Sequence, residues 1–128
     1  MKTEPLKGKK ILIVDDEDFL REVLSEIFAD SGAITKSAEN GTKAFEILQV
    51  EKFDAVISDI RMPGGDGLSL IENISTQLEE KPKVFLCSGF NDISPEKAKK
   101  FEVVEIFSKP FNNEKLVDSV ARVLTLDH

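Results

Sequence analysis

The sequence predicts an α/β fold in which helices cover both faces of a doubly wound, five-stranded parallel sheet. Five short apolar runs, each of a length that suits a buried strand, alternate with segments whose apolar residues recur at helical spacing. This alternation is typical of parallel sheets with right-handed crossovers. The chain has 128 residues, which suits one domain with one core. We expect a single domain over residues 1–128, with its core at about 9–125.

The elements follow from the apolar pattern and from residues that begin or end helices. The predicted strands cover residues 9–14, 33–38, 55–57, 84–87 and 103–107. The first helix is expected to stop at Ser31-Gly32 and to bury an apolar stripe formed by Phe19, Leu20, Val23, Leu24, Ile27 and Phe28. The later helices are expected to begin near Asn40, Asp66, Ser94 and Asn112. The helix after Ser94 has room for about two turns.

Composition excludes several classes of protein. The net charge is −7, which argues against a broad attraction to nucleic acid or to an anionic membrane. Cys87 is the only cysteine, so neither an intrachain disulfide nor a cysteine-based zinc cluster can form, and we expect it to be a small core residue. The apolar run at residues 11–14 is far too short for a signal or transmembrane segment, and we expect a cytoplasmic protein. The only histidine, His128, is the last residue, which argues against a catalytic histidine.

Polar residues end the apolar strands in a repeated pattern. Residues 53–67 contain a strand that ends in Asp59, followed by a loop that Pro63, Gly64 and Gly65 favour. That segment alone fits either a site or an ordinary turn aspartate. The other strand ends carry Asp15 and Asp16, Ser88 and Lys109. Because sites in such folds form at the carboxyl ends of the strands, we expect these side chains to converge.

The predicted edge would hold three carboxylates, from Asp15, Asp16 and Asp59. Each close pair would repel by about 3–4 kcal/mol at roughly 4–5 Å and an effective dielectric constant of about 20. They therefore need a cation or a shared proton. An all-oxygen set of ligands favours Mg²⁺, which keeps part of its water shell and could share the site with a phosphate. The alternative is an acidic patch that holds no ion.

The chain resembles a response regulator receiver domain over residues 11–124. The resemblance rests on Val14-Asp15-Asp16, on residues 58–64 with Asp66-Gly67, on Cys87-Ser88-Gly89 and on Lys109-Pro110-Phe111. It implies a flavodoxin-like (βα)5 fold with strand order 2-1-3-4-5.

The resemblance also implies the chemistry of the site. Asp59 would be the nucleophile that accepts a phosphoryl group and forms an aspartyl phosphate. Asp16, Asp59 and the carbonyl of Arg61 would coordinate Mg²⁺ directly, and Asp15 would act partly through water. Lys109 would pair with a phosphoryl oxygen.

Further roles are implied around these residues. The Ser88 hydroxyl would hydrogen-bond to the phosphoryl group, and Gly89 would leave room for the donor. The peptide bond between Lys109 and Pro110 would be cis.

These roles imply a phosphorylation-dependent switch of a two-component or phosphorelay system. A histidine kinase or histidine phosphotransfer protein would donate to Asp59, and the modified domain would change its binding to a downstream protein effector, without direct binding to nucleic acid or membrane. The chain would not be an enzyme beyond catalysing its own phosphorylation and dephosphorylation. One alternative is a receiver-fold binding module that works without phosphorylation. Another is an aspartyl-phosphate hydrolase, which the adjacent Asp15-Asp16 pair and the lack of residues for a cap disfavour.

The output side departs from the family pattern. Receivers carry an aromatic residue three positions before the lysine, where this chain has Ile106, and strand alternation should point the adjacent Phe107 to the other face of the sheet. We therefore expect an unusual readout, and we expect residues 91–101 to be mobile or unusually placed.

Overall fold

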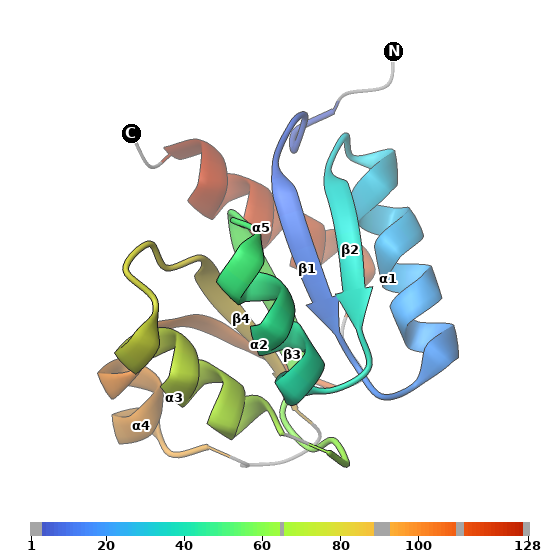
Figure 1. Cartoon of the computed structure of the whole chain (residues 1–128). Coiled ribbons are helices and arrows are strands. Elements are labelled where there is room, and N and C mark those ends of the chain that lie inside the picture. Colours follow the sequence, from blue (N-terminus) through green and yellow to red (C-terminus); the bar gives the residue numbers. More distant parts are fainter. Residues whose placement is uncertain (1–3, 65, 89–92, 110–111, 127–128) are drawn as a thin grey trace.

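The computed structural model describes residues 4–64, 66–88, 93–109 and 112–126 of the chain. In the described part, five strands alternate with five helices (Figure 1). In chain order they are β1 (Lys10–Val14), α1 (Asp18–Asp30), β2 (Ile34–Ala38), α2 (Gly41–Val50), β3 (Ala55–Asp59), α3 (Gly67–Gln77), β4 (Lys83–Ser88), α4 (Pro95–Lys100), β5 (Val103–Ser108) and α5 (Asn113–Leu126). These bounds agree with the predicted elements to within a few residues.

The strands form one parallel sheet in the order β2-β1-β3-β4-β5. This confirms both the predicted fold class and the predicted strand order. The helices lie on the two sides of the sheet, with α1 and α5 on one side and α2 and α3 on the other (Figure 1). Each side has its own apolar cluster, one around Phe28 and Phe85 and the other around Leu70 and Leu86. The first cluster also contains Leu6, which precedes β1 and is fully buried.

The helices cover the centre of the sheet more fully than its two edges. The central strands β1, β3 and β4 are buried along nearly their whole length. In β2 only Ala38 is buried, and no residue of β5 is. Each edge strand has only one neighbour, and the six-residue helix α4 is too short to cover β5. Val104 and Ile106 are therefore exposed.

The prediction that α1 buries its whole apolar stripe is wrong for one residue, Phe19. Phe19 is 73% exposed, whereas Leu24 and Phe28 are buried. Phe19 precedes Leu24 by five residues, which places it about 140° away around the helix. The other stripe residues lie closer to the direction of the core, so Phe19 belongs to the solvent side of the first turn.

The predicted helix starts are confirmed by their capping bonds. The side chains of Asn40, Asp66, Ser94 and Asn112 each accept a hydrogen bond from the backbone N–H three residues later. These bonds satisfy donors that the first helical turn leaves unpaired.

The expected short fourth helix is confirmed, and so is the alternation along β5. Phe107 packs against the apolar cluster on the α1 and α5 side, while its neighbour Ile106 is 39% exposed. Residues 91 and 92 lie outside the described residues. The expected mobility or unusual placement of residues 91–101 stays a prediction.

Candidate functional site

The side chains that end three strands meet at one edge of the sheet, as the sequence predicts. Asp15 follows β1, Asp59 ends β3 and Lys109 follows β5. Carboxylate oxygens of Asp15, Asp16 and Asp59 lie within 4.8 Å of one another. The Lys109 ammonium nitrogen Nζ is 2.9 Å from Oδ2 of Asp59 and 3.9 Å from Oδ2 of Asp15. Lys109 thus partly neutralises two of the three carboxylates, those of Asp59 and Asp15.

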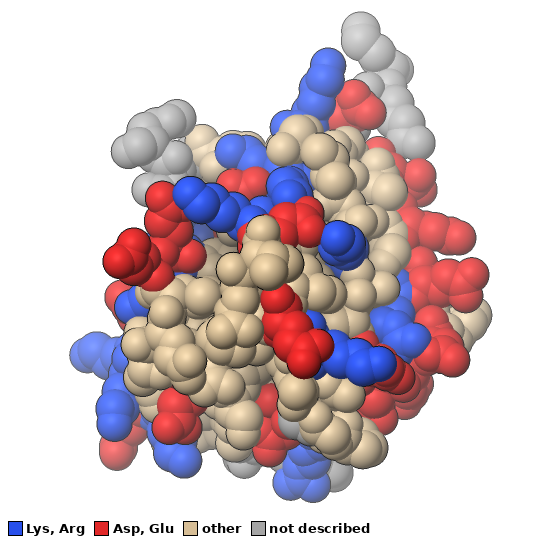
Figure 2. All heavy atoms as spheres, in the orientation of Figure 1, with Lys and Arg blue, Asp and Glu red and all other residues tan. Residues whose placement is uncertain are grey.

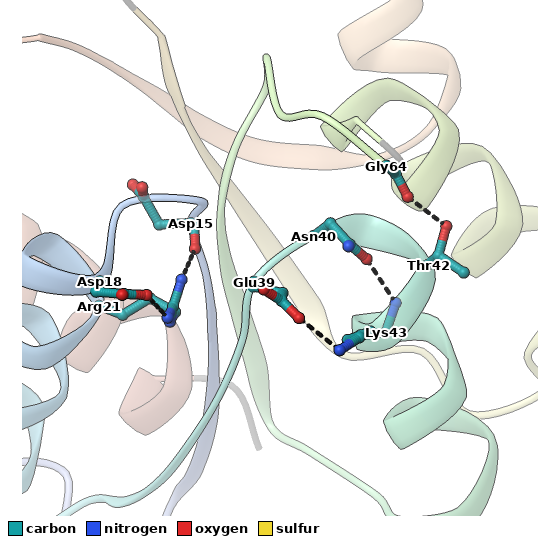
Figure 3. A network of polar contacts seen from close by, with 8 residues as sticks. All are labelled: Asp15, Asp18, Arg21, Glu39, Asn40, Thr42, Lys43 and Gly64. Atoms are coloured by element: carbon teal, nitrogen blue, oxygen red, sulfur yellow. Dashed lines mark hydrogen bonds and ion pairs between the residues drawn. The ribbon is translucent and has the colours of Figure 1, made fainter.

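Two hydrogen bonds hold Asp15, which is only 4% exposed. Its Oδ1 atom accepts a 2.8 Å hydrogen bond from the backbone N–H of Glu17, and its carbonyl oxygen accepts a 2.6 Å bond from Nη1 of Arg21. Arg21 also forms an ion pair with Asp18, and Figure 3 shows it between the two aspartates. Burial raises the pKa of Asp15, and the nearby carboxylates of Asp59 and Asp16 add to this. The Glu17 N–H and Lys109 oppose the increase only partly.

The backbone of Asp59 is fixed from two directions. The Ser58 hydroxyl donates a 2.7 Å hydrogen bond to the Asp59 carbonyl oxygen, and the N–H of Gly67 donates a 2.6 Å bond to the carbonyl of Ile60. Gly67 lies so close that a Cβ atom there would be 2.4 Å from the Asp59 carbonyl oxygen. The Asp59 carboxylate accepts a 2.8 Å bond from the N–H of Ile60. The nucleophile candidate therefore has little freedom to move.

Lys109 and Ser88 are linked through the backbone. The Lys109 N–H donates a 2.7 Å hydrogen bond to the Ser88 carbonyl oxygen, which joins the ends of β4 and β5. Ser88 is 2% exposed and Lys109 is half-buried. Burial lowers the pKa of Lys109, but the hydrogen bond to Asp59 and the charges of Asp59 and Asp15 outweigh it, so that the net pKa is raised. Lys109 is therefore a permanent cation at neutral pH.

The loop between β3 and α3 carries Arg61, whose side chain is exposed while the neighbouring Ile60 and Met62 are buried. Gly64 has a backbone φ of +82°, a conformation that favours glycine and that the sequence predicts for this loop. Its carbonyl oxygen accepts a 2.8 Å bond from the Thr42 hydroxyl at the start of α2 (Figure 3). The expected roles of Gly65, Gly89 and the bond between Lys109 and Pro110 fall on residues outside the described ones.

A cavity of about 390 Å³ lies beside the site. Asp59 and Lys109 line it together with Leu20 and Leu24 of α1 and with Cys87 of β4. Cys87 is buried, which confirms its predicted place in the core. Burial raises its pKa to about 12, so its thiol is neutral at physiological pH and is a poor nucleophile.

The donor set suits a hard divalent cation. The group consists of three carboxylates, which supply oxygen ligands within a small space. It contains no histidine nitrogen and no thiol sulfur. Mg²⁺ and Ca²⁺ prefer oxygen ligands, and Mg²⁺ commonly takes only one or two carboxylates and keeps several waters. The residues therefore fit the ion that the sequence predicts. Asp16 is exposed, Asp59 half-buried and Asp15 buried, so the group opens to solvent on one side.

Three residues that help to build the site are given no role by the sequence analysis. Gly67 allows α3 to approach Asp59, Arg21 holds the Asp15 carbonyl and Thr42 holds the β3–α3 loop. Gly67 immediately follows the capping Asp66, a local signal that could have marked it. Thr42 and Gly64 are 22 residues apart, and nothing in the sequence pairs them.

Comparison with known proteins identifies the family. The family described as "Response regulator receiver domain" matches residues 11–121. The chain is 30% identical to sporulation initiation phosphotransferase F of Bacillus subtilis, over 94% of this chain and 98% of that protein. It is 31% identical to chemotaxis protein CheY of Halobacterium salinarum, over 92% and 98%. It is 37% identical to the Regulator of RpoS of Escherichia coli over 84% of this chain, but it spans only 32% of that protein.

Solved structures agree with this assignment. The signal receiver domain of a signal transduction histidine kinase from Syntrophus aciditrophicus superposes with a TM-score of 0.82 at 27% identity, covering 94% of this chain and 92% of that one. Chemotaxis response regulator CheY4 of Vibrio cholerae gives a TM-score of 0.80 at 28% identity, covering 91% and 99%. Among the described residues, no helix is long and apolar enough to cross a membrane. With the sheet order, the acidic site and these relatives in agreement, the chain belongs to the response regulator receiver domain family.

Proposed function

We propose that the chain is a phosphorylation-dependent signalling switch that accepts a phosphoryl group on Asp59. The observation that carries this proposal is the contact between Lys109 and Asp59, at 2.9 Å, inside a group of three carboxylates. A fixed carboxylate beside a fixed cation suits phosphoryl transfer, which needs positioning and charge neutralisation more than proton transfer.

In the proposed step, an oxygen of the Asp59 carboxylate attacks phosphorus as the bond from phosphorus to the donor breaks. With a phosphohistidine donor, the imidazole nitrogen leaves with the bonding electron pair and the phosphoryl group becomes an aspartyl phosphate. With acetyl phosphate, acetate leaves in the same way. The hydrogen bond from Ile60 N–H to Oδ1 orients the carboxylate for this attack.

We propose that Asp15, Asp16, Asp59 and the backbone carbonyl of Arg61 hold Mg²⁺. When bound, Mg²⁺ supplies positive charge that neutralises the phosphoryl oxygens. The carboxylate oxygens of the three aspartates within 4.8 Å of one another support this assignment. The two bonds that hold Asp15 keep one ligand in place before any ion arrives.

Lys109 and Ser88 are proposed to contact the phosphoryl group after transfer. Lys109 would exchange its bond with Asp59 for one with a phosphoryl oxygen, and the Ser88 hydroxyl would donate a second bond. The backbone bond from Lys109 N–H to the Ser88 carbonyl would couple these two responses. Because Ile106 is aliphatic and exposed on β5, the signal would be read without rotation of an aromatic ring at that position.

The proposed partners are a histidine kinase or histidine phosphotransfer protein as donor and a protein effector as receiver of the signal, in the cytoplasm. Direct binding to nucleic acid is not part of the proposal, since the net charge is −7. On the face seen in Figure 2, basic and acidic side chains are interspersed, and acidic ones gather along the right-hand edge over α1.

The experiment that tests this function measures the intact mass of the protein after incubation with acetyl phosphate and Mg²⁺. The wild type should gain one phosphate, and Asp59→Asn should gain none. Asp54→Asn is a matched control, because Asp54 lies near the opposite end of β3 and an asparagine oxygen can still accept its bond from Lys10 N–H. It should gain phosphate like the wild type. A wild type that gains nothing would favour the binding module, and repeated turnover of a phosphate ester would favour a hydrolase.

A further inference from the structure

The start of α2 is joined to the loop that follows Asp59. The Thr42 hydroxyl donates a 2.8 Å hydrogen bond to the carbonyl oxygen of Gly64. Figure 3 shows the two residues facing each other across the gap between α2 and the loop. The bond links residues 22 positions apart, and so it restrains the loop relative to the body of the domain.

Asn40 fixes the end of α2 that presents Thr42. Its side-chain oxygen accepts a 2.9 Å hydrogen bond from the Lys43 N–H, and this bond caps the helix. The amide nitrogen Nδ2 of the same side chain lies close to the loop. A Cβ atom at Gly64 would be only 3.0 Å from it. Gly64 also has a φ of +82°, so both its conformation and its surroundings suit glycine. The helix start and the loop are therefore fitted to each other.

The bond holds a part of the loop that burial in the core does not hold. The side chains of Ile60 and Met62 are buried in the same apolar cluster as Ala44 and Leu48 of α2. Pro63 and Gly64, which follow, are exposed. Arg61 thus lies between two residues that are anchored in the core, and the Thr42 bond restrains the exposed section that follows them.

We propose that Thr42 is a positioning residue for the metal site, because its bond to Gly64 keeps the β3–α3 loop in the arrangement in which the Arg61 carbonyl serves as a ligand. The inference rests on the proposed function, in which that carbonyl binds Mg²⁺. Without the bond, the loop would adopt more conformations. A smaller fraction of them would place the Arg61 carbonyl where it can bind the ion. The affinity for Mg²⁺ should fall without loss of any carboxylate ligand.

The test compares the Mg²⁺ dissociation constants of unphosphorylated variants, measured by amide shifts in NMR titrations. Thr42→Val and Thr42→Ala remove the hydroxyl, and Thr42→Ser keeps it. A net hydrogen bond of ordinary strength predicts an affinity roughly two- to tenfold weaker for the first two variants and nearly unchanged for Thr42→Ser. Thr76→Val is the matched control, because the Thr76 hydroxyl bonds to the Glu72 carbonyl within α3, at 2.9 Å, and does not touch the loop.

Phosphorylation by acetyl phosphate at several Mg²⁺ concentrations gives a second measurement. Thr42→Val should need more Mg²⁺ for half the maximal rate but should approach the wild-type rate at saturation. The inference is overturned if Thr42→Val and Thr42→Ala bind Mg²⁺ like the wild type, or if Thr76→Val weakens binding as much as they do. A wild type that binds Mg²⁺ but gains no phosphate would instead contradict the proposed function, while the affinities would still test the role of Thr42.

Discussion

Gly67 and Asp59 are in contact through their backbones, so closely that a Cβ atom on Gly67 would lie 2.4 Å from the Asp59 carbonyl oxygen and 2.9 Å from the α-carbon of Ile60. Real side chains do not approach backbone atoms this closely. The first turn of α3 can therefore pack beneath Asp59 only because residue 67 is glycine. The contact therefore fixes the position of the Asp59 backbone relative to α3 at this edge of the sheet.

Gly67→Ala should therefore damage both stability and function. The added methyl group must push α3 or the Asp59 backbone aside, and overpacking of this kind typically costs about 1–3 kcal/mol of unfolding free energy. Urea denaturation measures that loss, and phosphorylation by acetyl phosphate should also be slower. Ser69→Ala, an exposed change in the same helical turn, should alter neither by much. A stable Gly67→Ala variant with the wild-type phosphorylation rate would contradict this reading of the contact.

Asp15→Asn should make the metal-free domain more stable at neutral pH. Burial raises the pKa of Asp15 above its ordinary value of 3.8, so the folded state binds its proton more tightly than the unfolded state does. The stabilisation from this group is complete below pH 3.8 and is lost as the pH rises through the higher pKa of the folded state. Asparagine avoids the buried charge, and it can still accept the bond from Glu17 N–H.

Thermal melts in the presence of a chelator test this prediction. The melting temperature of Asp15→Asn should exceed that of the wild type at pH 7, and the difference should shrink as the pH falls toward 3.8. Added Mg²⁺ should stabilise the wild type more than the variant, because an ion that binds only the folded state stabilises it by mass action. Asp15→Asn melting below the wild type at pH 7 would show that the carboxylate stabilises the fold.

Lys109→Gln should bind Mg²⁺ more tightly but accept phosphate more slowly. The ammonium group lies 2.9 Å from an Asp59 oxygen and competes there with any other cation. Two unit charges at 4 Å interact by about 1 kcal/mol even in bulk water, which corresponds to roughly a fivefold gain in affinity when the lysine charge is removed. Calorimetric titration with Mg²⁺ measures the affinity. Lys36→Gln, which removes the same charge from the edge strand β2, should change it little; weaker binding by Lys109→Gln would refute the competition.

Two phenylalanines of α1 should differ sharply when each is replaced by alanine. Phe28 is fully buried and Phe19 is 73% exposed. Phe28→Ala should lower the free energy of unfolding by about 3–5 kcal/mol because it leaves a cavity. Phe19→Ala should change it by less than about 0.5 kcal/mol. Denaturation of the two variants under the same conditions makes the comparison, and equal losses would mean that Phe19 contributes to the core.

Local pattern was enough to predict the parts of this structure that depend on neighbours in the chain. The buried strands are continuous apolar runs, and the helix starts are single capping residues such as Asn40 and Asp66. The convergence of Asp15, Asp59 and Lys109 followed from one general rule, that the carboxyl ends of parallel strands share an edge.

What escaped prediction depends on contacts between distant residues or on the edges of the sheet. The exposure of Ile106 reflects the place of β5 at one edge, beside a helix too short to cover it. The exposure of Phe19 depends on the rotation of α1 against the sheet, which its apolar spacing only approximates. The bond between Thr42 and Gly64 joins two turns that have no common sequence signal.

The most direct test of the account is to locate the phosphoryl group on the protein. Borohydride reduces an aspartyl phosphate to homoserine, and trypsin should release residues 53–61 as one peptide, since Lys52 and Arg61 bound it. That peptide contains both Asp54 and Asp59, so fragment ions must distinguish them. The account predicts homoserine at position 59 after treatment with acetyl phosphate and Mg²⁺. Homoserine at Asp54 or at another carboxylate, with position 59 unchanged, would contradict it.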